Sequence, residues 1–167
     1  MNAYVGLAIG LAGALLQATI LADYRVAGVH PDLVLLAVVG WAALHRVQDG
    51  LLWASLGGLS TDLASAGPFG GSLVGMIAAA LTGGAIGRRV RRSHPFLAVL
   101  AVPFAAAAYY LVGLLVVPAE GGLAGRLGLA LEVAGPAVVL DSLIGVPTMV
   151  LLIWLSRAIS PPSWSSP

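Results

Sequence analysis

The stretch Gly50–Gly70, GLLWASLGGLSTDLASAGPFG, places a carboxylate, Asp62, near the end of a segment that is otherwise apolar. A charged side chain inside a membrane segment costs about 3 kcal/mol or more, so it is rarely found there without a partner. The residues that follow Asp62 are rich in Ser, Gly and Pro, which favour turns. An acid at this position therefore requires either a structural partner or a function.

The composition of the whole chain is that of an integral membrane protein. Hydrophobic residues make up 59% of the sequence, charged residues only 9%, and the mean hydropathy is +0.99. Soluble domains carry about 25% charged residues. A helix needs roughly 20 residues to cross a bilayer, so the 167 residues suffice for about five or six crossings and leave no separate soluble domain.

Several function classes are disfavoured by what the sequence contains. A net charge of +1 without a basic tail does not indicate nucleic-acid binding. The chain has no cysteine, which excludes disulfides and thiolate metal sites. The histidines His30, His45 and His94 fall in expected loops rather than in a His-Glu-x-x-His helix. No Gly-x-Ser-x-Gly elbow occurs, and the aspartates lack the sequence contexts of intramembrane aspartyl proteases and lipoprotein signal peptidases. We expect no enzymatic activity, cofactor or metal.

The apolar runs predict an all-α bundle of about six transmembrane helices in a single domain, residues 1–159, before a disordered tail, residues 160–167. The first run lacks a basic n-region, which favours a retained helix over a cleaved signal peptide. The second and third are short, so a re-entrant hairpin is the alternative to two crossings. Crossing is favoured because a hairpin would bury His45, Arg46 and Asp49 in hydrocarbon. The predicted helices cover about 4–21, 31–44, 51–66, 72–86, 96–117 and 137–158.

Arginine sets the predicted orientation, since lysine is absent. With both termini cytoplasmic, the cytoplasmic segments hold Arg46, Arg88, Arg89, Arg91, Arg92 and Arg157, whereas Arg25 and Arg126 lie outside. Trp41, Trp53 and Trp154 then fall near the cytoplasmic ends of their helices, as an aromatic belt would. The cluster from Arg88 to Arg92 is interpreted as a topology anchor in preference to a binding site for anionic lipid.

Two predicted helices carry small residues at every fourth position, which places them on one helix face and allows close helix packing. Packing within the chain is favoured over docking of a partner helix, for which the first helix is the better candidate. The ladders are Gly6, Gly10, Ala14 and Ala18 in the first helix, and Gly71, Gly75, Ala79, Gly83 and Gly87 in the fourth.

The acids differ in their predicted depth. Asp32 follows Pro31 at a helix start, where a negative charge complements the helix dipole. Asp62 and Asp141 are each expected about one turn inside the outer ends of their helices, on the same side as Asp32. We expect Asp62 to tie down the turn that follows it; ligand binding and catalysis are the less favoured alternatives. Tyr109 and Tyr110, a deep aromatic pair, are expected to be core packing.

The order and spacing of several motifs resemble the rod shape-determining protein MreD family. The resemblance covers about 40 residues, from Pro-Asp-Leu at a helix start through Gly-Leu-x-x-Asp-Leu to a Pro-x-Gly turn. Its matching positions are Pro31, Asp32, Gly58, Asp62, Pro68 and Gly70. The fourth helix is richer in Gly and Ala than the family pattern suggests.

This resemblance implies a non-catalytic scaffold of the bacterial elongation complex, in the inner membrane, that acts in cell-shape maintenance and lateral peptidoglycan synthesis. It implies direct association with MreC, indirect association with RodA, its partner transpeptidase and MreB, and contact with membrane lipids; a homodimer is left open. The implied fold is similar to the substrate-capture subunits of energy-coupling-factor vitamin transporters. Such a subunit is the alternative function, disfavoured because few polar or aromatic residues are expected in the outer half.

Overall fold

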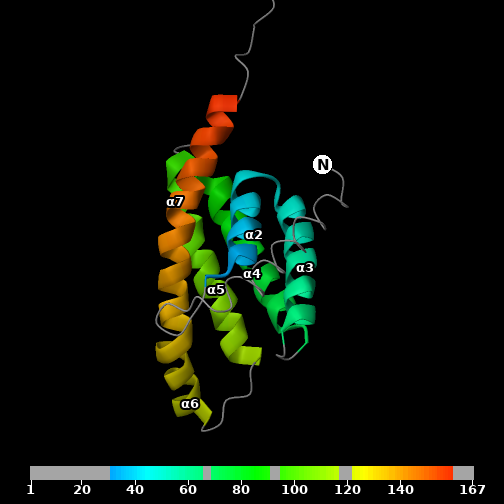
Figure 1. The fold of residues 1–167 in the computed structure, drawn as a ribbon, viewed down its shortest axis with the longest axis vertical. Helices are drawn as coiled ribbons and strands as arrows, with labels where there is room; N and C mark the ends of the chain where they lie inside the picture. The colour runs from blue at the N-terminus through cyan, green and yellow to red at the C-terminus, as the bar shows by residue number, and fades with distance from the viewer. Residues whose placement is uncertain (1–30, 66–68, 91–94, 117–121, 160–167) are drawn as a thin grey trace, which may run out of the picture.

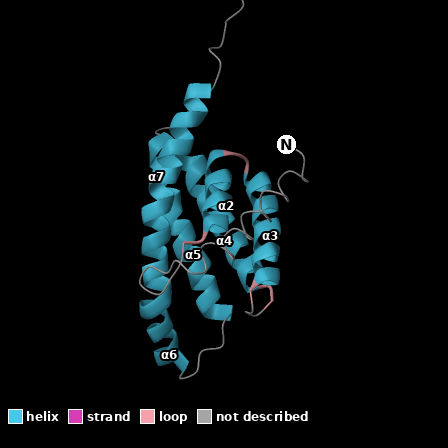
Figure 2. Cartoon of the chain, viewed as in Figure 1, coloured by secondary structure: helices cyan, strands magenta, loops and turns pink. Residues whose placement is uncertain are grey.

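The computed structural model describes residues 31–65, 69–90, 95–116 and 122–159. The first predicted helix with its small-residue ladder, Pro68, Arg91, Arg92 and the predicted tail lie outside these ranges. The described part is entirely helical, without strands (Figures 1 and 2). Its elements are α2 (Leu33–Leu44), α3 (Val47–Ala64), α4 (Gly71–Val90), the 3₁₀ segment η2 (Pro95–Leu100), α5 (Ala101–Val116), α6 (Gly122–Leu129), the π-helical segment η3 (Ala130–Ala134) and α7 (Gly135–Ile159).

Within the part of the chain that the structure describes, three helical stretches are long and apolar enough to cross a membrane: Gly71–Val90, Ala98–Val116 and Gly122–Val150. They support the assignment as a membrane protein. Helix α2 has 12 residues, so it is only about 18 Å long and shorter than the roughly 30 Å hydrocarbon core. Three spans are therefore supported by length and composition, whereas the six-crossing topology and the orientation of the termini stay predictions.

Helix α2 lies at the centre of the bundle, with α5 and α7 on one side and α3 on the other (Figure 1). It is buried on two faces, as expected for a helix that is apolar all round. Leu35 and Val39 face a core cluster that includes Met149 of α7. Val38 belongs to a second cluster with Met76 of α4. The short helix therefore joins the two halves of the core.

The small-residue ladder of α4 is used for packing within the chain, as predicted. A Cβ atom added to Gly87 would lie 2.4 Å from the carbonyl oxygen of Ala43, on α2. At Gly75 it would lie 2.8 Å from the ring of Tyr109, on α5. At both positions the ladder lets α4 approach a neighbouring helix more closely than any side chain would allow.

The prediction for the last helix was wrong at its start. A helix was predicted over 137–158, after a loop, but the chain is helical from Gly122 through α6, η3 and α7. Pro136 cannot donate a backbone hydrogen bond and would be expected to break the helix. Here the preceding turn widens into a π-helix, in which the Gly135 N–H reaches the Ala130 carbonyl, and the helix continues past the proline.

The other helix boundaries lie close to the predicted ones. Helix α3 begins at Val47 rather than at residue 51, and α4 continues to Val90 rather than stopping at residue 86. In both cases the helix extends into polar residues that the search for apolar runs left out. Helical backbone needs no apolar side chains once it leaves the hydrocarbon.

Candidate functional site

The carboxylate of Asp62 caps the helix that follows its own. Oδ2 accepts hydrogen bonds from the backbone N–H groups of Gly70, at 3.0 Å, and Leu73, at 3.2 Å. Oδ1 accepts one from the N–H of Ser72, at 2.9 Å. The first amides of a helix have no partner within the helix and carry a partial positive charge. A buried carboxylate on α3 therefore satisfies the start of α4, which confirms the expectation that Asp62 ties down this turn.

Two glycines make this capping possible. A Cβ atom on Gly58 would lie 2.5 Å from the Cα atom of Leu73, so only glycine lets α3 approach the first turn of α4 this closely. Asp62 lies four residues later on the same helix face and reaches the same turn. Gly70 has a φ of +92°, in the left-handed region that other residues avoid, and it reverses the chain into α4.

A second network joins α2, α5 and α7 through the buried carboxylate of Asp141. Its Oδ1 accepts the backbone N–H of Asp32, at 2.8 Å, and its Oδ2 accepts the hydroxyl of Tyr110, at 2.8 Å. Asp32 in turn caps its own helix, since its Oδ1 accepts the Leu35 N–H at 2.9 Å. Asp141 is 0% exposed and Asp32 is 5% exposed. The structure thus brings two of the three singled-out acids into direct contact.

The predicted depth of Asp141 was wrong. It was placed about one turn inside the outer start of its helix, but Gly122 begins the continuous helix about five turns earlier. Asp141 therefore lies deep in the bundle, beside the start of the short α2. The error follows from starting the predicted helix at residue 137, which left out the helical residues from Gly122 onward.

Tyr110 was expected to be core packing and its polar role was missed. Its ring stands at 80° to that of Tyr109, with ring centroids 5.0 Å apart, as in a packed aromatic pair. The hydroxyl, however, donates to Asp141. The indication available in the sequence was Asp141 itself, because an acid deep in an apolar helix must find hydrogen-bond donors on neighbouring helices.

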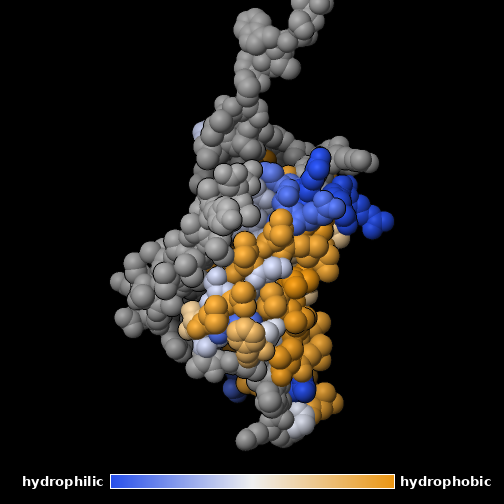
Figure 3. Space-filling view, turned by 90° about the vertical axis from the view of Figure 1, so that its right-hand side faces the viewer, coloured by the Kyte–Doolittle hydropathy of each residue, from blue (hydrophilic) through white to orange (hydrophobic). Residues whose placement is uncertain are grey.

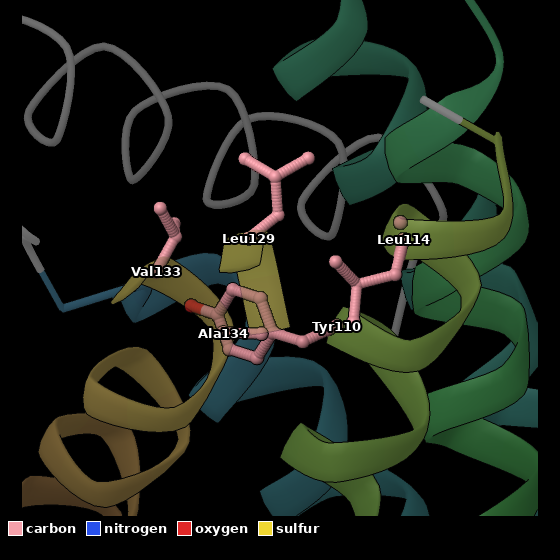
Figure 4. Close-up of a pocket in the computed structure, with 6 residues that line it drawn as sticks. Tyr110, Leu114, Leu129, Val133 and Ala134 are labelled. Atoms are coloured by element: carbon pink, nitrogen blue, oxygen red, sulfur yellow. The ribbon is translucent and has the colours of Figure 1, made fainter. Parts of the chain in front are cut away.

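A pocket of about 200 Å³ lies between α5 and the α6–η3 segment (Figure 4). The ring of Tyr110 forms one wall, and the other lining residues are Gly113, Leu114, Leu129, Val133 and Ala134. At its edge the guanidinium of Arg126 donates to the carbonyl oxygen of Leu114, near the end of α5. Arg126 was expected in an outer loop; it is helical and ties α6 to α5. The lining offers van der Waals contact to an alkyl group rather than hydrogen bonds.

Within the described ranges, no three His, Asp, Glu or Cys side chains come together as a group that could hold a metal ion. The acids instead accept hydrogen bonds from backbone amides and from a tyrosine. Comparisons of the chain with protein-family models, with curated proteins and with solved structures found no match.

Proposed function

We propose that this chain is a non-catalytic membrane scaffold of the bacterial elongation machinery, the role implied by its resemblance to the MreD family. The proposal rests on one observation, which is what the motif residues contact in the structure. Asp32, Gly58, Asp62 and Gly70 all serve contacts between helices or the turn between them. A motif used in this way fixes the shape of a surface that a partner recognises.

The same observation bears on the alternative, a vitamin-capture subunit. Such a subunit would need hydrogen-bonding groups that converge on a polar ligand. The acids of the motif are engaged with backbone amides, and the pocket beside Tyr110 has an apolar lining. Both features favour the scaffold over the capture subunit.

The test is co-purification of a tagged chain from bacterial membranes in mild detergent, with the partners identified by mass spectrometry. The scaffold predicts a single-span protein with a coiled-coil ectodomain, together with wall synthases. Co-purifying ATPases in their place would refute it and support the transporter subunit.

A matched pair of variants tests whether the partner binds through the first helix. The first-helix ladder predicts a face on which helices pack closely, so Gly10→Leu should lower recovery of the partner. Ile9→Leu, one position away and off that face, should leave recovery unchanged. Equal recovery with both variants would show that the partner uses another helix.

A further inference from the structure

The arginines at one end of the bundle come from two separate places in the sequence. Arg46 lies in the turn between α2 and α3, and Arg88 and Arg89 lie in the last turn of α4. The helices bring them to the same end, because Gly84 packs against Val47 and Gly87 packs against the backbone of α2 at close range. The sequence predicted all three on the same side of the membrane, but it did not predict that the α2–α3 turn and the end of α4 pack against each other.

Arg46, Arg88 and Arg89 are exposed, and none of their guanidinium groups forms an ion pair or hydrogen bond with another described residue. Asp49, in the first turn of α3, is the only acid of the described ranges at this end. The end therefore carries an excess of positive charge. Figure 3 shows hydrophilic atoms gathered here, directly against a hydrophobic band.

An aromatic cluster lies at the same end of the bundle. Trp41 stacks on His45, with ring centroids 4.1 Å apart and planes at 10°. Trp53, on α3, lies 5.5 Å from Trp41. Tryptophan clusters of this kind lie at the depth of lipid headgroups. Arg46 directly follows His45 in the chain, so we expect headgroup phosphates at the level of the three arginines.

We propose that Arg46, Arg88 and Arg89 form a binding site for the headgroup of an anionic phospholipid. Arginine presents donors in a planar fork that matches phosphate oxygens, and a phosphodiester at this level supplies the missing negative charge. The acyl chains of the bound lipid lie along the apolar outer surface below, where Leu52 of α3 and Leu81 of α4 are exposed. The site is independent of the scaffold role, because it requires only insertion in a membrane.

The experiment measures spin-labelled lipids that are immobilised by the purified chain in phosphatidylcholine vesicles. Labelled phosphatidylglycerol should associate several-fold more strongly than labelled phosphatidylcholine. Each arginine contributes about fivefold to attraction of an anionic lipid, so Arg88→Gln alone should lower the preference by about that factor. The triple Gln variant should abolish it, whereas the triple Lys variant, which keeps the charge but lacks the planar fork, should retain only part of it.

Two outcomes would overturn the proposal: a wild-type chain without preference for phosphatidylglycerol, or a triple Gln variant that keeps it. If the triple variant does not fold, Asp49→Asn decides the question. Removal of this acid should raise the preference about fivefold, and an unchanged preference would count against the site. Arg126→Gln, which removes an arginine from α6, should have no effect.

Discussion

Replacement of Asp62 is the sharpest test of how the α3–α4 turn is held. In Asp62→Ala, the N–H groups of Gly70, Ser72 and Leu73 all lose their acceptor. Loss of one ordinary helix cap costs about 1 kcal/mol, and each hydrogen bond to a charged group contributes about 2 kcal/mol. Since contributions to one carboxylate are not additive, we expect a loss of about 3 kcal/mol in the free energy of unfolding.

Asp62→Asn should lower the free energy of unfolding by less than Asp62→Ala, because an amide can keep some of the hydrogen bonds. If the amide oxygen takes the place of Oδ2, it keeps the bonds from Gly70 and Leu73. The amide nitrogen then faces the N–H of Ser72, so one bond and the negative charge are lost. We expect this variant to lose about 1.5 kcal/mol, roughly half the effect of alanine.

The assay is unfolding of the detergent-solubilised protein by sodium dodecyl sulfate, followed by tryptophan fluorescence; Trp53 lies on the same helix as Asp62. The matched control is Asp49→Ala, which removes an exposed acid of α3 and should change stability by about 0.5 kcal/mol or less. The capping argument fails if Asp62→Ala is no more destabilising than this control.

Three further predictions concern the packing and the second network. Gly87→Ala should lower the free energy of unfolding by about 2 kcal/mol or more, because its Cβ would meet the backbone of α2. Gly113→Ala should be neutral or slightly stabilising, because a Cβ there would meet nothing within 4 Å. Unfolding in detergent compares the two variants. Gly70→Ala should cost about 1 kcal/mol through its positive φ alone, measured the same way, and no loss would contradict the turn geometry. Tyr110→Phe and Asp141→Asn should each lower the free energy of unfolding by about 1 kcal/mol, and their effects should not add in a double-mutant cycle. Additive effects would show that the two side chains share no hydrogen bond.

The start of α2 and the role of Asp62 could be predicted because local chemistry determines both. Aspartate is a favoured N-cap residue, and Asp32, directly before the first helical residue Leu33, does accept the Leu35 N–H. An acid followed by a short turn has the next helix start within reach. Similarly, the glycine spacing in α4 predicted close packing, although it could not say which helices would provide the partners.

The contact between α2, α5 and α7 could not be predicted, because it depends on relations between distant residues. Asp32 and Asp141 are 109 positions apart in the sequence. Their meeting depends on how α7 packs against α2 and α5, while the unbroken helix from α6 into α7 depends on how the chain passes Pro136. A proline ends most helices, and only the π-helical turn before it, a tertiary adjustment, keeps this one continuous.

The brevity of α2 has a consequence for how the protein enters the membrane during synthesis. A segment of 12 apolar residues, with a proline and an aspartate before it and His45 and Arg46 after it, is too short to be released stably into lipid by itself. Its buried neighbours on α4, α5 and α7 are made later. We therefore expect α2 to integrate together with those helices after they are made, rather than in its linear order along the chain.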